Sequence, residues 1–228
     1  MLSVLPDTML GALPEDIRGA TKPRKDDPFT PELKIMRRDL ATLAFACADA
    51  VGKTALHYGG EDLWAIGTMP GYEPLADSLE GMARGFLSDS HLSAAHTDVV
   101  TGTIKMSGDL RTAARGARQA VQIAFLFRAD RGYGAQALEL LSPMAEAVSA
   151  VAERAAFAAQ TGDQSAATQA VQAFRNVDTL RVQVETGICS HSWDEHFPPT
   201  VQRLIRAATW NFAVSGESMA RVAARLIA

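Results

Sequence analysis

The chain has 228 residues, a formal net charge of −4 and 47% hydrophobic residues. This composition is typical of a globular protein with enough apolar residues for one large or two smaller cores. The mild acidity argues against general nucleic-acid binding, which normally requires a clear basic excess. The two cysteines, Cys47 and Cys189, are expected to be buried thiols of a reducing compartment and to form no disulfide.

Neither a membrane segment nor a signal peptide is predicted. Polar residues interrupt every apolar stretch well before about 20 residues, the length that a bilayer-spanning helix needs. The first residues, MLSVLPDTMLGALPEDIRG, lack a basic start and a continuous apolar run. We therefore expect a cytoplasmic protein that neither inserts into a membrane nor binds nucleic acid.

The first part of the chain predicts a flexible tail followed by two helical stretches. Residues 1–30 are rich in proline, glycine and charge, which is typical of a mobile terminus. A helix should begin at Thr30, with Pro31 in its first turn, and end at the glycines of HYGGED. Its apolar seam consists of Leu33, Met36, Leu40, Leu43, Ala44, Cys47 and Val51. The next stretch covers DLWAIGTMPGYEPLADSLEGMARGFL, where Pro70 and Pro74 are expected to kink or break a helix.

A long third helix is predicted from near His91 to about Asp130. Apolar and small residues recur there at helical spacing, at Val99, Thr103, Met106, Leu110, Ala113, Ala117, Ala120, Ala124 and Phe127. After the break RADRGYGAQ, three helical segments follow again, the last from about Thr200 to the end. The sequence therefore predicts an all-α fold of two tandem three-helix bundles, with one repeat at 31–131 and the other at 132–228.

Two short motifs suggest chemistry but are weak. Gly52-Lys53-Thr54 resembles the end of a phosphate-binding loop, yet no strand precedes it, so a helix surface is expected. The loop CSHSWDEHF offers transition-metal ligand types at Cys189, His191, Asp194, Glu195 and His196. Because no second ligand pair accompanies it, an ordinary loop between helices is the stronger expectation. No segment has the spacing of a hydrolase's nucleophile or of a hydrolase's paired carboxylates, so no enzyme is predicted.

The two halves of the chain align with an offset of about 100 residues, and the repeat points to a family. EPLADSLEG meets FRNVDTLRV, so that Asp77 aligns with Asp178. Over residues 32–228 the layout resembles the PhoU family of phosphate-uptake regulators, which are built from two three-helix repeats. Members carry a DxxID.L stretch on the middle helix of each repeat and a dLERIGDhA.nIA stretch on the third. Glu73 and Asp77 fit the first pattern, and KMSGDLRTAARGARQAVQIA follows the second in its apolar positions.

The resemblance implies metal binding by acids one helical turn apart, and this chain departs from that pattern. Two such carboxylates share a helix face, which suits a hard divalent cation. The acids that remain of the family's set are Glu73, Asp77, Asp178 and Glu217. The aligned places without an acid hold Phe174, Ala213, Arg111 and Arg115. A divalent metal ion as cofactor is implied by the resemblance, while these departures leave its retention open.

Arg111, Arg115 and Arg118 form a stripe on the third predicted helix, and three interpretations of it stay open. In the first interpretation the stripe is a solvated face, turned away from the apolar seam. Alternatively, Arg111 and Arg115 pair with Glu73 and Asp77, so that salt bridges replace a cation. In the third interpretation the stripe binds an anion or a partner. Exposed pairs would each contribute only about 0–1 kcal/mol to stability.

The resemblance implies a regulatory adaptor of phosphate uptake or phosphate signalling that acts through protein–protein contacts. Its implied partners are a phosphate transporter subunit or a sensor kinase, and we also expect a homo-oligomer. A helical metal-binding or redox protein is the alternative, but it would require inward-facing Glu-x-x-His pairs, which the sequence lacks. A DNA-binding regulator would require a basic helix-turn-helix near the start, but the tail before Thr30 is too short and too rich in proline to form one.

Overall fold

The computed structural model describes residues 30–60, 72–88, 92–190 and 196–227. Six α-helices follow one another in these ranges, and no strand occurs in them. They are α1 (Thr30–Tyr58), α2 (Tyr72–Leu87), α3 (Ala94–Ala129), α4 (Gly134–Thr161), α5 (Gln164–Cys189) and α6 (Pro199–Ile227). The predicted all-α fold of two three-helix units is confirmed. The predicted tail before Thr30 and the predicted break at Pro70 lie outside the described residues.

Local sequence signals account for the helix ends. α1 stops at Tyr58, before Gly60, whose φ of 97° is a left-handed conformation that favours glycine. The side chain of Ser93 caps α3, because its hydroxyl oxygen accepts a hydrogen bond from the backbone N–H of His96 at 3.2 Å. Gly162, with a φ of 71°, ends α4. The polar and glycine residues between apolar seams therefore place the helix boundaries.

Three details of the sequence prediction are wrong. Pro74 does not break α2, because it lies in the first turn, where the backbone N–H that proline lacks would have no intrahelical partner. The buried seam of α3 starts at Val100, whereas Val99 is only half-buried. Cys189 is exposed at the end of α5, although a buried thiol was expected. Cys47 is buried as predicted.

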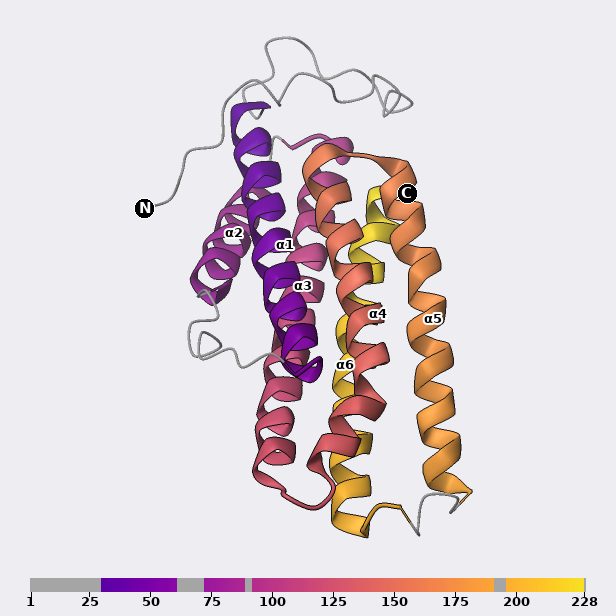
Figure 1. Ribbon diagram of the computed structural model, residues 1–228. Helices are drawn as coiled ribbons and strands as arrows, with labels where there is room; N and C mark the ends of the chain where they lie inside the picture. Colours follow the sequence, from indigo (N-terminus) through magenta and orange to yellow (C-terminus); the bar gives the residue numbers. More distant parts are fainter. Residues whose placement is uncertain (1–29, 61–71, 89–91, 191–195, 228) are drawn as a thin grey trace.

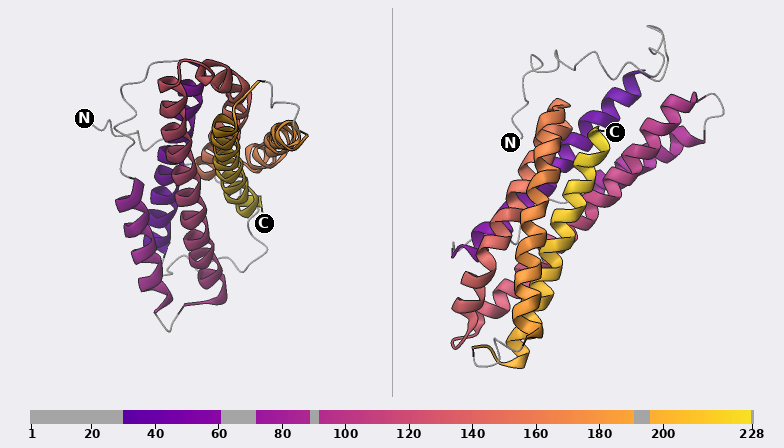
Figure 2. Two further views of the ribbon diagram at one scale, coloured as in Figure 1. Left: turned by 90° about the horizontal axis from the view of Figure 1, so that it is seen from below. Right: turned by 90° about the vertical axis from the view of Figure 1, so that its right-hand side faces the viewer.

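Equivalent helices of the two halves pack against each other. α1 lies along α4 and α3 along α6, and these four helices enclose the core (Figures 1 and 2). α2 covers α1 and α3 on one side, and α5 covers α4 and α6 on the other (Figure 1). The largest fully buried side chains include Phe127, Phe212, Leu110 and Leu141. The duplication seen in the sequence is thus also an arrangement in space, with each helix of the core facing its counterpart.

The contact between α3 and α6 is close because small residues meet there. The Ser215 hydroxyl oxygen lies 2.9 Å from the carbonyl oxygens of both Ala113 and Asn211, which share its single proton as hydrogen-bond acceptors. Gly116 faces Ser215 and Asn211, so a Cβ atom at this position would overlap with atoms of both residues. Glycine at 116 is therefore required by the short distance between the two helices.

A second glycine holds the turn between the halves. In the turn, the Asp130 carboxylate accepts hydrogen bonds from the backbone N–H groups of Gly132 and Tyr133, at 2.8 and 3.1 Å. At Gly134, the first residue of α4, a Cβ atom would overlap with the carbonyl group of Phe127. The chain can thus turn from α3 into α4 only because residue 134 is a glycine, which has no Cβ atom.

The two thiols should differ sharply in reactivity. Burial raises the pKa of the Cys47 thiol to about 12, and this thiol donates a hydrogen bond to the carbonyl of Leu110 at 3.4 Å. At pH 8 about one Cys47 thiol in ten thousand would be ionised, and the thiolate is the reactive form. We expect a coloured thiol reagent to titrate one cysteine in the native protein and two after unfolding. In Cys189→Ser the native signal should vanish; rapid labelling of that variant would contradict the burial of Cys47.

Candidate functional site

Acids of α2 and arginines of α3 meet along one face. Arg111 donates a hydrogen bond from its guanidinium to the carboxylate of Asp77, and its Nε lies 3.3 Å from Glu80 Oε1. A guanidinium nitrogen of Arg118 lies 3.1 Å from Glu73 Oε1. We call Glu73, Asp77, Glu80, Arg111 and Arg118 the acid–arginine face. In this face α2 supplies the acids and α3 supplies the arginines, so ion pairs join the two helices.

The arginine that pairs with Glu73 is Arg118 and not Arg115. Arg115 is exposed and has no ion-pair partner within the described part of the chain. Helix geometry explains the difference, because a residue seven positions after Arg111 returns to within about 20° of it, whereas a residue four positions after it is turned by about 40°. Glu73 and Glu80 are also seven residues apart, so the two helices present charges at the same spacing of about 10 Å.

Glu80 of this face and Tyr72 beside it were missed in the sequence. Glu80 is only 17% exposed and accepts a hydrogen bond from the Ser107 hydroxyl at 3.3 Å. The ring of Tyr72 lies 5.4 Å from the guanidinium carbon of Arg118, a cation–π distance. Burial raises the pKa of the Tyr72 phenol, and the positive charge of Arg118 opposes that rise. The seven-residue spacing from Glu73 was the available signal for Glu80; for Tyr72 there was none.

The acids of the second half are held by arginines within their own repeat. Arg181 donates to Asp178 at 2.7 Å and lies 3.0 Å from Glu185, all on α5. Arg221 lies 2.7 Å from Glu217 on α6. Arg221 also reaches across to Asp109 of α3 at 2.9 Å. Ion pairs thus join α2 to α3, whereas Arg181 forms its ion pairs within α5.

The acids that the resemblance suggested as metal ligands do not come together. Among the described residues, no three side chains of His, Cys, Asp or Glu are close enough to hold a metal ion. Each of the four acids Glu73, Asp77, Asp178 and Glu217 has an arginine within ion-pair distance. This donor set does not fit a divalent cation, which needs several oxygens directed at one point.

The two weak motifs have different outcomes. Gly52-Lys53-Thr54 lies within α1, where Lys53 forms an ion pair with Asp49 at 2.6 Å and Thr54 is fully buried. The expected helix surface is confirmed for Lys53, while the hydroxyl of Thr54 points inward and donates to the carbonyl of Ala50 at 2.8 Å. Of the loop CSHSWDEHF, His191, Asp194 and Glu195 lie outside the described residues, and Cys189 and His196 are exposed. 

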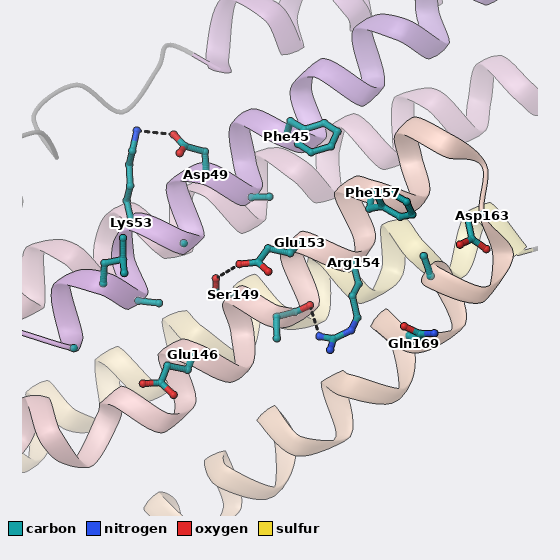
Figure 3. A pocket seen from close by; sticks show the side chains of 17 residues that line it. Phe45, Asp49, Lys53, Glu146, Ser149, Glu153, Arg154, Phe157, Asp163 and Gln169 are labelled. Carbon is teal, nitrogen blue, oxygen red and sulfur yellow. Dashed lines mark hydrogen bonds and ion pairs between the residues drawn. The ribbon is translucent and has the colours of Figure 1, made fainter. Parts of the chain in front are cut away.

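A groove runs between α1, α4 and the start of α5 (Figure 3). It has a volume of about 1070 Å³ and is lined mainly by small and apolar residues, including Ala48, Gly52, Ala55, Ser149, Ala150 and Ala166. Three large apolar side chains line it and stay exposed: Phe45 at 41%, Leu56 at 45% and Phe157 at 49%. Concave apolar surfaces of this kind favour binding of an apolar segment of another molecule.

Of the arginines in the stripe, Arg111 should contribute to the stability of the protein, whereas Arg115 should not. Arg111→Ala removes the cation that joins α3 to Asp77 and Glu80 of α2, and it leaves Glu80 only Arg84 of its own helix, at 3.4 Å. We therefore expect a loss of up to about 1 kcal/mol in the free energy of unfolding. Amide hydrogens of α2 should also exchange faster. Arg115→Ala, which removes an unpaired exposed arginine, should change neither quantity. Equal effects of the two variants in urea unfolding and hydrogen exchange would contradict the role of the acid–arginine face.

Within the described ranges, no helix is both long and apolar enough to cross a membrane. Comparison of the chain with models of protein families, with curated proteins and with solved structures finds no match. The fold and the contacts described above are therefore the observations on which a function can be proposed.

Proposed function

We propose that this protein is a PhoU-like regulatory adaptor of phosphate uptake or phosphate signalling, which acts in the cytoplasm through protein–protein contacts. The observation that carries the proposal is the duplicated trio of helices, in which α1 lies along α4 and α3 along α6. The motif positions that suggested the family support it as well, because Glu73, Asp77 and Arg111 lie on the two neighbouring helices α2 and α3. A subunit of a phosphate transporter or a sensor kinase is the partner proposed.

Surface chemistry supports binding rather than catalysis as the activity. Long helices expose large apolar side chains, among them Phe45, Phe157 and Trp210, and such side chains are common where proteins bind proteins. The groove between α1 and α4 provides one concave surface for such a contact. The role of the protein would then be to bind a partner and change its activity.

In this proposal the arginines of α3 take the place of a metal ion. Arg111 and Arg118 neutralise the α2 carboxylates by direct contact, so the face needs no cation to bring its acids together. Elemental analysis of protein purified without chelators should therefore find no divalent metal in a one-to-one ratio. A stoichiometric ion that disappears in Glu73→Gln would contradict this part of the proposal.

The adaptor role is tested by capture from the native cell. The full chain, tagged and expressed at its natural level, should co-purify with subunits of a phosphate transporter or with a sensor kinase, in amounts that change with phosphate supply. The double variant Phe45→Ser, Phe157→Ser should lose the partner. Val171→Ser, which alters an exposed apolar residue of α5 outside the groove, is the matched control and should retain it. If only unrelated proteins are captured, the proposed function is wrong.

A further inference from the structure

A second surface of the molecule combines an exposed tryptophan with two arginines. The side chain of Trp210 on α6 is 62% exposed, the largest exposure among the large hydrophobic residues in the described part of the chain. Arg203, Arg206 and Ala207 precede it at intervals that place all four on one side of the helix. Together with Glu185 of α5, they line a hollow of about 380 Å³. We call these five residues the Trp–Arg patch.

The patch carries positive charge that nothing described on the chain neutralises. Arg203 and Arg206 have no ion-pair partner among the described residues. The acid that lines the hollow with them, Glu185, is already bonded to Arg181, which donates to both of its carboxylate oxygens at 3.0 and 3.1 Å. Two guanidinium groups are thus left to a ligand, on a protein whose net charge is −4.

From this charge and this exposed indole we infer that the Trp–Arg patch binds an acidic segment of a partner protein. Carboxylates of the segment would accept paired hydrogen bonds from Arg203 and Arg206, and an apolar side chain would pack on the indole of Trp210. Tryptophan and arginine are the residue types that most often dominate binding energy at protein interfaces. The inference rests on the proposed function in one respect, since it takes the partner to be a protein.

Two other occupants fit the patch less well. An anionic membrane surface is normally bound by clusters of about four to eight basic residues, whereas this patch has two unpaired arginines and includes the acid Glu185. A second copy of the chain, docked symmetrically on the same patch, would bring Arg203 and Arg206 of the two molecules together. Because like charges repel, the charge pattern favours a different, acidic partner.

The probe for this inference is a fluorescent 14-residue peptide of glutamate and leucine, with leucine at every third or fourth position. Its binding to the full-length protein is measured by fluorescence anisotropy. We expect Arg206→Glu to weaken binding at least tenfold and Trp210→Ala about fivefold, and added salt to weaken it further. Arg37→Glu is the matched control, because Arg37 is also exposed and has no ion-pair partner within the described residues. This control should bind within twofold of the unchanged protein.

Each contrary outcome is recognisable. Equal affinities of Arg206→Glu and Arg37→Glu, or equal binding of a peptide with glutamine for glutamate, would overturn the inference. The inference would also be overturned if the peptide does not bind and the patch has another occupant instead. That occupant would be seen as binding to vesicles of anionic phospholipid, or as a dimer in light scattering, and Trp210→Ala would abolish it. Thermal unfolding of each variant shows that the fold is intact. If Arg206→Glu still captures the transporter or kinase from cells, the inference fails and the proposed function stands.

Discussion

Gly116→Ala should lower the free energy of unfolding by about 1–3 kcal/mol, which is the usual cost of overpacking a core. The added methyl group would meet the hydroxyl of Ser215 and the carbonyl oxygen of Asn211 on α6. Moving the Ser215 side chain is not cheap, because its hydroxyl donates to the carbonyl of Ala113 at 2.9 Å. The substitution therefore forces α3 and α6 apart along the contact between the two halves.

Glycines of the same helix provide the control. A Cβ atom at Gly102 or Gly108 would meet nothing within 4 Å. Because alanine is the better helix former, Gly102→Ala and Gly108→Ala should each raise the free energy of unfolding by up to about 1 kcal/mol. Urea unfolding followed by circular dichroism measures all three variants. If Gly116→Ala is stabilising like its neighbours, the close approach of α3 to α6 is not present in solution.

Gly134→Ala is expected to be the most harmful single substitution, with a loss of about 3 kcal/mol or more. Its Cβ atom would overlap with the carbonyl oxygen and carbon of Phe127, which belong to the backbone of the last turn of α3. A side chain can rotate out of the way, but a backbone carbonyl cannot move without opening the helix end. The turn from Asp130 to Tyr133 would have to change its path.

Gly132→Ala, two residues earlier in the same turn, is the matched control. A Cβ atom there would meet only an oxygen of Asp130, at 3.4 Å, so a small effect is expected. Thermal and urea unfolding of both variants test the difference. Similar stability of Gly132→Ala and Gly134→Ala would show that the turn tolerates a side chain at the start of α4, in disagreement with the structure.

The helical framework was predictable because each helix carries its own signals. The seam from Thr103 to Phe127 is buried as its three- and four-residue spacing predicts, and Gly162 ends α4 where the sequence TGD interrupts the apolar pattern. Pro74 was misjudged because its effect depends on its distance from the helix start, which the sequence left uncertain. Local rules predict elements well and their first residues less well.

The acid–arginine face was predictable only in part. The inversion of charge at the aligned motif suggested ion pairs between arginines of α3 and acids of α2 as one of three open interpretations, and Arg111 does contact Asp77. Which arginine reaches Glu73 depends on the rotation of α2 about its own axis, and the packing of Tyr72 and Leu79 into the core sets that rotation. The exposure of Trp210 is likewise a property of the packed molecule, because tryptophan in a helix is more often covered.

Because each core helix packs against its counterpart in the other half, two separate fragments of the chain, divided after α3, would each expose a large apolar surface. A fragment ending at Ala129 would expose the surfaces of α1 and α3 that α4 and α6 cover, and the complementary fragment would expose the matching ones. Such fragments would have to find each other by diffusion, so their assembly would depend on dilution. The short turn after α3 removes that dependence, since it makes the encounter of the two halves a first-order event within one polypeptide.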